Sequence, residues 1–458
     1  MHRASALDQL FVNLETVTTR QTIAIVNFLT EAPDVEVLNY AVDDLLKVLP
    51  RLGESYQDKS WTAQSSNRDF LEIIKCLPGE TTEQRLEERF SRGLDVRDQP
   101  WKVVLILPSK IQPGQIQPSQ IQLGQILSGQ ATTNNQPVLL NLYHHAFVDG
   151  LGCRKILEAL CKLTTGKIDS KRILSERKLQ PIEQDGSHEA KLYNKIYSQK
   201  RSVLRWLAEL FKAPATSVFN GQNSNQRKVI FRDFDLQRLQ PLKKHYACSM
   251  NDLLVAMLAR ACGLLHQQTG TKLPEIRFLV PFSSRAASEQ YALGNRLSGV
   301  AVPIKLDTLE IPALISKVSR EISDLMQSGA QGAYFVVGEM VSRIPSLRFQ
   351  RFLCELQARR THFICTNVPI SAASPLYLGN TTVSATYGLP ALMRGQGIAV
   401  GLITYNHKLG LSIVYDPAIT SQAETLAEIF LAELEKLAIT FIQLDSAGIQ
   451  PLQRLSAT

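Results

Sequence analysis

Long uncharged hydrophobic runs are missing from this sequence of 458 residues. No stretch reaches the ~18 apolar residues that a membrane-spanning helix needs, and the best candidate, residues 253–265, is short and contains Arg260. The first residues also lack a basic segment followed by an apolar one, because Asp8 and Glu15 interrupt them, which argues against a secretory signal. We therefore expect a cytoplasmic protein whose contact with a membrane, if any, is peripheral.

Cysteine is present at seven positions but never as a Cys-x-x-Cys pair, and seven is an odd number. Most of these cysteines lie in apolar runs, which indicates reduced thiols in the core. We expect neither a disulfide framework nor a metal site. Charged residues make up 20% of the chain and hydrophobic residues 44%, which is the balance of a folded globular protein.

The charge is unbalanced, with a formal net value of +8. An excess of this size permits anionic partners such as a membrane surface, a phosphorylated cofactor or nucleic acid. No helix of clustered arginines and no interleaved surface aromatics accompany it, so the sequence predicts no nucleic-acid partner.

Strand-like and helix-like segments alternate along the chain and indicate a mixed α/β (α+β) fold. The length favours two domains, and we expect an N-terminal domain at 1–185, a linker at 186–228 and a C-terminal domain at 229–458. Strands are predicted at 22–28, 101–107, 138–143, 228–234, 276–282, 298–305, 363–369, 380–386, 397–405 and 409–415, and helices at 35–49, 151–165, 253–265 and 421–443.

Two segments have an unusual composition. Four five-residue copies rich in Gln, Pro, Gly and Ser follow one another from Ile111 to Gln130. They favour a mobile, dispensable insertion at 108–137 that joins two paired strands, 101–107 and 138–143. Residues 189–213 are predicted to form a basic amphipathic helix, which suits either docking on protein between the domains or docking on a membrane surface.

The most informative stretch is His144-His145-Ala-Phe-Val-Asp149-Gly150, which lies between a predicted strand and a predicted helix. Adjacent side chains of an extended backbone point to opposite sides, so one histidine can face a channel while the other packs. An imidazole near neutral pH can take a proton from a hydroxyl or amine that attacks an activated carbonyl. Asp149 either caps the following helix or pairs with a buried arginine, and Gly150 permits a backbone shape closed to other residues.

This stretch matches the His-His-x-x-x-Asp-Gly signature of the chloramphenicol-acetyltransferase-like superfamily. Further segments, in the right order, resemble the bacterial wax ester synthase/diacylglycerol acyltransferase family from about residue 137 to 440. They are Ser249-Met-Asn251-Asp252, Pro281 to Arg285, Leu293 to Gly299, Thr366 to Pro369, Ser374 to Tyr377, Gly395 to Val400 and Thr404 to Asn406. Ala6 to Phe11 fits the opening of the family, whereas Pro100-Trp101, Ile370 and the glutamine-rich insertion depart from its pattern and bear on substrate preference.

The resemblance implies two chloramphenicol-acetyltransferase-like domains with a channel between them. His145 would be the general base, His144 a supporting residue, and Asp149 would hold the loop, with Arg285 as its expected partner. Gly150, Asn251, Asp252 and Asn295 would shape the site at the domain junction, although Asn251 and Asp252 also suit a helix start and Asn295 a simple turn.

The implied reaction is transfer of a fatty acyl group from acyl-CoA, a co-substrate, to a long-chain alcohol or diacylglycerol, with no bound cofactor. The product would be a wax ester or triacylglycerol, made at a membrane or lipid-droplet surface if the enzyme binds one. One alternative is a condensation-like or polyketide-associated acyltransferase that uses a carrier-protein thioester. Another is a non-catalytic lipid-binding relative.

Overall fold

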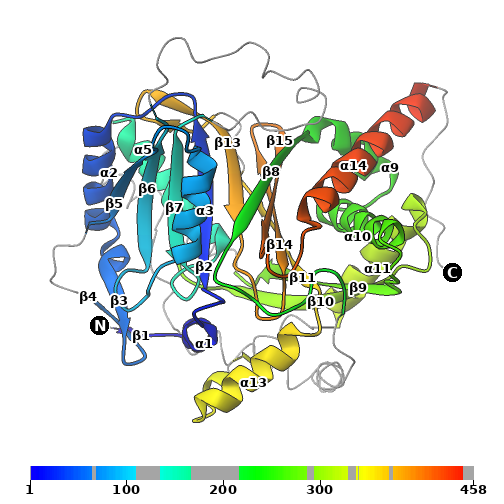
Figure 1. Cartoon of the computed structure of the whole chain (residues 1–458), viewed down its shortest axis with the longest axis horizontal. Coiled ribbons are helices and arrows are strands. Elements are labelled where there is room, and N and C mark those ends of the chain that lie inside the picture. Colours follow the sequence, from blue (N-terminus) through cyan, green and yellow to red (C-terminus); the bar gives the residue numbers. More distant parts are fainter. Residues whose placement is uncertain are drawn as a thin grey trace.

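The computed structural model describes residues 2–63, 69–109, 135–166, 216–285, 293–328, 337–338, 340–370 and 375–446. The repeat at 111–130, the basic segment at 189–213 and Ser374 lie outside the described residues. Two six-stranded sheets stand side by side, with helices on their outer faces (Figure 1). A small three-stranded sheet, β1 (His2–Arg3), β4 (Ser60–Ala63) and β3 (Glu54–Gln57), lies at the N-terminal end.

The first large sheet has the strand order β12-β13-β2-β7-β6-β5. Its strands are β2 (Thr22–Leu29), β5 (Leu71–Lys75), β6 (Trp101–Leu107), β7 (Val138–His144), β12 (Tyr377–Leu378) and β13 (Thr381–Leu389). Strands β6 and β7 pair antiparallel, which confirms the predicted pairing across the insertion. Every residue of β2 and β7 is buried, because helices cover one face of this sheet and the second sheet covers part of the other.

The helices of this half follow amphipathic patterns. They are α1 (Ala6–Leu14), α2 (Val35–Val48), the 3-10 turn η1 (Pro50–Gly53), α3 (Thr82–Arg92) and α5 (Gly150–Thr164). The apolar stripes of α2 and α5 pack together on the outer face of the sheet, around Leu38, Leu45 and Ile156. Helix α1 starts at a capping box made by Ser5 and Asp8.

The second sheet has the order β10-β9-β11-β14-β15-β8. Its strands are β8 (Lys228–Asp235), β9 (Glu275–Ser283), β10 (Leu297–Lys305), β11 (Phe363–Pro369), β14 (Ile398–Tyr405) and β15 (Lys408–Tyr415). The helical elements of this half are η3 (Leu236–Leu239), α9 (Gln240–His245), α10 (Met250–Gln268), α11 (Ile311–Gln327), α13 (Leu347–Ala358) and α14 (Ala423–Ser446).

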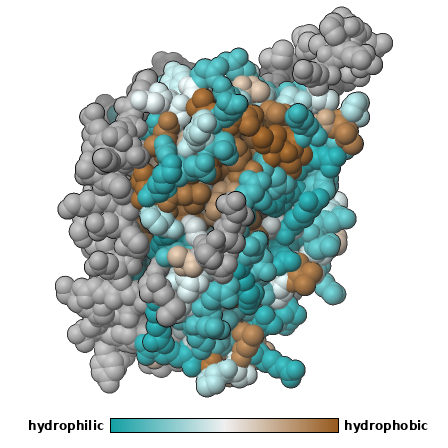
Figure 2. Space-filling view, turned by 90° about the vertical axis from the view of Figure 1, so that its left-hand side faces the viewer, coloured by the Kyte–Doolittle hydropathy of each residue, from teal (hydrophilic) through white to brown (hydrophobic). Residues whose placement is uncertain are grey.

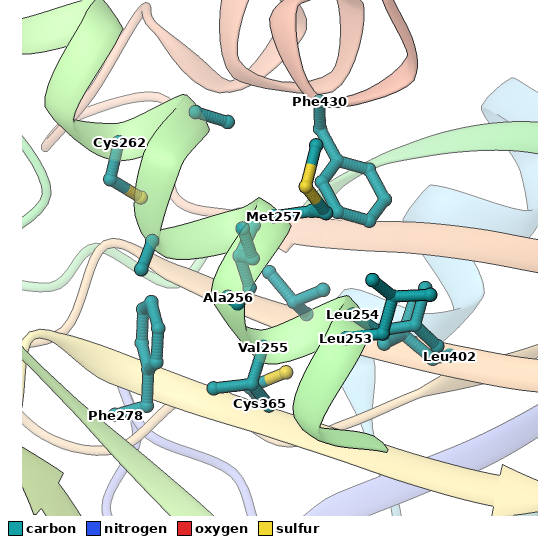
Figure 3. Close-up of a cluster of buried hydrophobic side chains, with 14 of the residues drawn as sticks. Leu253, Leu254, Val255, Ala256, Met257, Cys262, Phe278, Cys365, Leu402 and Phe430 are labelled. Carbon is teal, nitrogen blue, oxygen red and sulfur yellow. The ribbon is translucent and has the colours of Figure 1, made fainter. Parts of the chain in front are cut away.

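Helix α10 forms the centre of the C-terminal core. Figure 3 shows its Leu253, Val255 and Met257 beside Cys365 of β11 and Phe430 of α14. Most of α10 is buried, since α11 and α14 flank it and the sheet lies beneath it. All seven cysteines are free thiols and six are buried, as the sequence predicted.

The chain crosses between the two halves near its end, which corrects the predicted domain boundary. Strands β12 and β13 belong to the range 229–458 in sequence, but β13 pairs with β2 of the first sheet, Leu389 opposite Ala24. The strand that follows, β14, returns to the second sheet. The first sheet is therefore complete only when a segment of the C-terminal half is added to it.

The two sheets also share a core. The Phe231 ring of β8 lies 5.4 Å from Phe28 of β2 and 4.6 Å from Tyr387 of β13, measured between ring centroids. Val26 and Val414 belong to the same buried cluster. This contact fixes the two halves relative to each other and leaves a cavity between them near the end of β7.

Candidate active site

The two histidines occupy the turn between β7 and α5, and they point in different directions. His144 is fully buried, and its Nε2 lies 3.1 Å from Oε2 of Glu15. The backbone N–H of Ala146 donates to Nδ1 of His144 over 3.2 Å. Because Nδ1 accepts, we infer that Nε2 carries the proton and donates it to the Glu15 carboxylate. His144 is therefore held in the core by Glu15 and by the backbone of its own turn.

His145 is partly exposed and lines the cavity. Its ring stacks on Phe11 of α1, with centroids 4.2 Å apart and planes at 10°. Its backbone N–H donates to the carbonyl of Gln21 over 2.7 Å. Burial lowers the pKa of His145 from its usual 6.5, while the nearby Asp149 charge opposes that shift. The imidazole is therefore neutral at pH 7 and can accept a proton.

Asp149 plays both of the roles that the sequence left open. Its Oδ1 accepts from the backbone N–H of Gly152 over 3.0 Å, which caps α5. Arg285, at the end of β9, donates to both carboxylate oxygens over 2.6 and 2.9 Å, which confirms the expected partner. The backbone N–H of Arg296 donates to Oδ2 over 3.0 Å. One buried carboxylate thus ties the motif turn to the C-terminal half.

Asn295 holds the same turn from the other side. Its Nδ2 donates to the carbonyls of His145 (2.8 Å) and Ala146 (2.9 Å), and to Oδ1 of Asp8 (3.2 Å). Asn295 is more than a turn residue, because it links the histidine backbone to α1. The structure therefore places Asn295, like Arg285, beside the motif.

Gly150 is required for a different reason from the one predicted. It is the first residue of α5 and is absent from the residues with positive φ, so its backbone shape is open to other residues. A Cβ at this position would lie 2.9 Å from Cγ2 of Val368 on β11. The glycine provides room for close approach of the two halves, and it also lines the cavity.

Asn251 and Asp252 are not among the residues that line the cavity, which corrects their expected role. Asp252 completes a capping box with Ser249 and accepts from Oγ of Ser319 on α11 over 3.2 Å. Helix α10 covers the face of β11 that carries Phe363 and Cys365, whereas the cavity is lined by Ile364, Thr366 and Val368 of the opposite face. The pair therefore starts a helix on the far side of the sheet.

The cavity is lined mainly by apolar residues of both halves. Helix α1 supplies Leu7, Leu10 and Phe11 to its wall, and α13, which projects beside α1 in Figure 1, supplies Cys354 and Ala358. Its polar lining includes Thr366, Arg351, Glu355 and Arg394. An apolar channel with a proton acceptor in its wall fits a long-chain substrate.

Two residues that hold the histidines were not predicted. Phe11 was noted only as part of the opening segment, and Glu15 only as an interruption of a signal-like pattern. Neither has a local signal, because the contact between Glu15 and His144 spans 129 residues of sequence. Among the described residues, no cluster of three His, Cys, Asp or Glu side chains could hold a metal ion.

Within the described ranges, no single helix is both long and apolar enough to cross a membrane. The segments 236–245 and 250–268 pass such a test only as a pair bent by 100°, and α10 is a buried core helix. Figure 2 shows the side of the molecule on which α2 lies, a mostly hydrophilic face with hydrophobic residues gathered in its upper half. On α2, Val37 and Tyr40 are exposed.

Residues 293–438 match the family described as the WS/DGAT C-terminal domain. Over this C-terminal range the chain is therefore similar to the wax ester synthase/diacylglycerol acyltransferase family. The matched range includes Asn295 and the crossing strands β12 and β13, so this family segment builds part of both sheets.

The chain is also similar to the O-acyltransferase WSD of Acinetobacter baylyi, with 24% identity over 318 residues. That match covers 59% of this chain and 63% of the relative, so the chain spans less than two thirds of the relative's length.

Solved structures show the same fold. The wax ester synthase/diacylglycerol acyltransferase from Marinobacter aquaeolei VT8 matches with a TM-score of 0.62 at 16% identity, over 96% of this chain and all 100% of that one. The first condensation domain of the calcium-dependent antibiotic synthetase matches with a TM-score of 0.67 at 14% identity, over 95% of this chain and 96% of that one. The starter condensation domain of rhizomide synthetase RzmA, with C8-CoA bound, matches with a TM-score of 0.63 at 13% identity, over 95% of this chain and 94% of that one. These likenesses confirm two chloramphenicol-acetyltransferase-like lobes.

Proposed function

We propose that this protein transfers a fatty acyl group from acyl-CoA to the hydroxyl of a lipid alcohol, with His145 as general base. The observation that carries this proposal is a partly exposed imidazole, with a pKa lowered by burial, in the wall of an apolar cavity. The acceptor is a long-chain alcohol or diacylglycerol, and the product a wax ester or triacylglycerol. The names of the Acinetobacter and Marinobacter relatives support this substrate class.

The reaction needs no bound cofactor. His145 takes the hydroxyl proton as the acceptor oxygen attacks the thioester carbonyl, and the carbonyl electrons move onto oxygen. The tetrahedral intermediate collapses, the carbon–sulfur bond breaks, and the leaving thiolate takes the proton back from the imidazolium. Phe11 and the carbonyl of Gln21 fix the ring and backbone of His145, so little reorganisation is required at the moment of proton transfer.

Thr366 is the side chain that best suits stabilisation of the oxyanion. It lines the cavity together with His145, on the face of β11 that also carries Ile364 and Val368. The structure gives its hydroxyl no hydrogen-bond partner among the described residues, whereas the neighbouring hydroxyls of Thr16 and Thr19 bond to each other over 2.6 Å. A fixed donor in an apolar site stabilises developing negative charge strongly.

The experiment uses purified protein with a long-chain acyl-CoA and a panel of fatty alcohols, diacylglycerol and amines, with products identified by mass spectrometry. We expect ester from the wild type and a loss of about 10²–10⁴-fold in His145→Ala, the usual worth of a general base. His407→Asn is the matched control, because His407 is exposed in a turn. Near-normal ester formation by His145→Ala contradicts the proposal.

A carrier-protein thioester is the second candidate donor, because the condensation domains share this fold over nearly the whole chain. The C8-CoA in the RzmA domain supports a CoA donor within the same fold. Initial rates with acyl-CoA and with an acylated carrier protein, compared at equal concentration, decide between the donors. A clear preference for the carrier would replace CoA in the proposal.

Contact with a lipid surface is proposed as peripheral. The net charge of +8 and the exposed Phe349 and Phe352 of α13, 49% and 55% accessible, support it. Flotation with anionic and neutral vesicles tests it. Recovery of the protein with neither kind of vesicle contradicts it.

A further inference from the structure

Two arginines pair with one glutamate, and a third arginine lies one turn before it, where α13 and the loop after β13 line the cavity. Arg394 pairs with Oε1 of Glu355, and Nη2 of Arg359 lies 3.9 Å from Oε2. Arg351, one turn before Glu355 on α13, lines the cavity together with Arg394 and Glu355. We call these four residues the mouth cluster. It has three positive groups and one negative group, 3 − 1, hence a net charge of +2.

Arg394 extends from a turn whose backbone is held in place. The N–H of Gly395 donates to Oδ1 of Asn223 over 2.8 Å, and the N–H of Gln396 donates to the carbonyl of Met393 over 3.0 Å. Gly395 has a φ of +82°, a conformation that favours glycine. The Arg394 side chain is 56% exposed, so a fixed turn presents a guanidinium group to solvent at the cavity.

Glu355 shows that two guanidinium groups of the mouth cluster can converge on one anion. It binds Arg394 through one oxygen and Arg359 through the other. An exposed ion pair of this kind adds little to stability, ~0–1 kcal/mol. Arg351 is different, because it donates to the carbonyls of Asn13 (2.8 Å) and Glu15 (3.3 Å) and so joins α13 to α1.

We propose that the mouth cluster, through Arg394, binds the phosphate of a phosphorylated pantetheine thioester. This inference rests on the proposed acyl transfer, because it assigns one end of the cavity to the donor. A guanidinium group offers paired donors that match phosphate oxygens. The acyl chain then lies along the apolar wall, and the thioester lies toward His145. A lipid alcohol or diacylglycerol carries no phosphate, so the mouth cluster selects the donor.

Calorimetric titration tests the inference without any need for turnover. The ligands are free CoA, 3′-dephospho-CoA, 4′-phosphopantetheine and pantetheine, added to the wild type, Arg394→Ala, Glu355→Gln and Arg348→Ala. Arg348 is the matched control, because it lies exposed on the same helix but does not line the cavity. Arg394 is preferred to Arg351 for the variant, since loss of Arg351 also separates α13 from α1.

We expect Arg394→Ala to raise the Kd for CoA about 10-fold, the low end for a hydrogen bond to a charged group at a partly exposed site. The Kd for pantetheine should not change in any variant. Glu355→Gln should tighten CoA binding, because it removes the competing carboxylate, and high salt should weaken it. If Arg394→Ala loses affinity for CoA but not for 3′-dephospho-CoA or phosphopantetheine, Arg394 contacts the 3′-phosphate. If it loses affinity equally for all three ligands, Arg394 contacts the phosphate nearest pantetheine.

Equal effects of Arg394→Ala on CoA and pantetheine, or none on either, overturn the inference. Weaker CoA binding in Glu355→Gln also overturns it, because the glutamate would then be organising the site. Failure of the proposed function looks different: CoA binding still responds to Arg394→Ala, while no acyl transfer is found with any donor and acceptor.

Discussion

Replacing Arg285 by alanine removes the guanidinium group that pairs with the buried Asp149 carboxylate. The two side chains are each 4% exposed, and two N–H···O contacts of 2.6 and 2.9 Å join them. The pair also joins the halves, since Arg285 lies two residues after the end of β9 and Asp149 is the N-cap of α5. We expect the variant to lose stability and to loosen the turn that presents His145.

The magnitude follows from what remains around the carboxylate. Without Arg285, Asp149 keeps, among the residues that the structure describes, the backbone N–H groups of Gly152 and Arg296, and it stays a buried charge without its ionic partner. Breaking a buried pair in this way costs about 3–5 kcal/mol. That is a large part of the ~5–15 kcal/mol that stabilises a folded protein. The stability of Arg285→Lys should lie between that of the wild type and that of Arg285→Ala, because an ammonium group cannot bind both carboxylate oxygens side by side.

Urea unfolding, followed by tryptophan fluorescence, measures the change as a shift in midpoint at constant m. Arg92→Ala is the control, because Arg92 and Glu88 form an ion pair on α3 that is 65% and 46% exposed. That substitution should cost ~0–1 kcal/mol. A loss below about 1 kcal/mol in Arg285→Ala, equal to the control, refutes the reasoning that this pair is a buried link between the halves.

Three smaller changes test the surroundings of the histidines. Glu15→Leu leaves the Nε2–H of His144 without an acceptor and should lower kcat up to about 10²-fold by misplacing the turn. Glu15→Gln should keep most of the wild-type kcat, because its amide oxygen can still accept that hydrogen bond. Equal losses of kcat in the two variants exclude a role for the hydrogen bond. Phe11→Ala admits water around His145, so the pKa of His145 should rise toward 6.5. The acid limb of the kcat/KM profile should then move to higher pH, because the base works only when it is neutral. Thr366→Val should lower kcat about 10²–10³-fold if its hydroxyl stabilises the oxyanion, and a kcat within about twofold of the wild type would assign that task elsewhere.

The long strands could be predicted from the sequence because their burial is simple. Strand β6 and strand β11 begin and end at the predicted residues, and β2 and β7 differ by one. Continuous apolar runs identify strands that are covered on both faces. The short strands β3, β4 and β5 were not predicted, since each has only four or five residues and buries only one or two of them.

The site was only partly predictable, for a related reason. The motif turn is local in sequence, so its two histidines and Asp149 could be identified from spacing. Asn295 reaches Asp8 across 287 residues, and nothing in the periodicity of either segment records that contact. Helix α13 was also missed: it exposes Phe349 and Phe352 and buries Gln350, the reverse of the pattern that marks a core helix.

The crossing strands explain why the predicted domain boundary was wrong and why the site lies where it does. A boundary read along the chain assumes that each half completes its own sheet, but β2 would be an open edge without β13. The loop that carries the chain back, from Pro390 to Gly397, lines the cavity and presents Arg394. The same strand exchange that holds the halves together therefore builds one end of the channel, while the Asp149–Arg285 pair fixes the turn that carries His145. His145 comes from the N-terminal half and the channel wall from both halves, so the site exists only in the assembled chain.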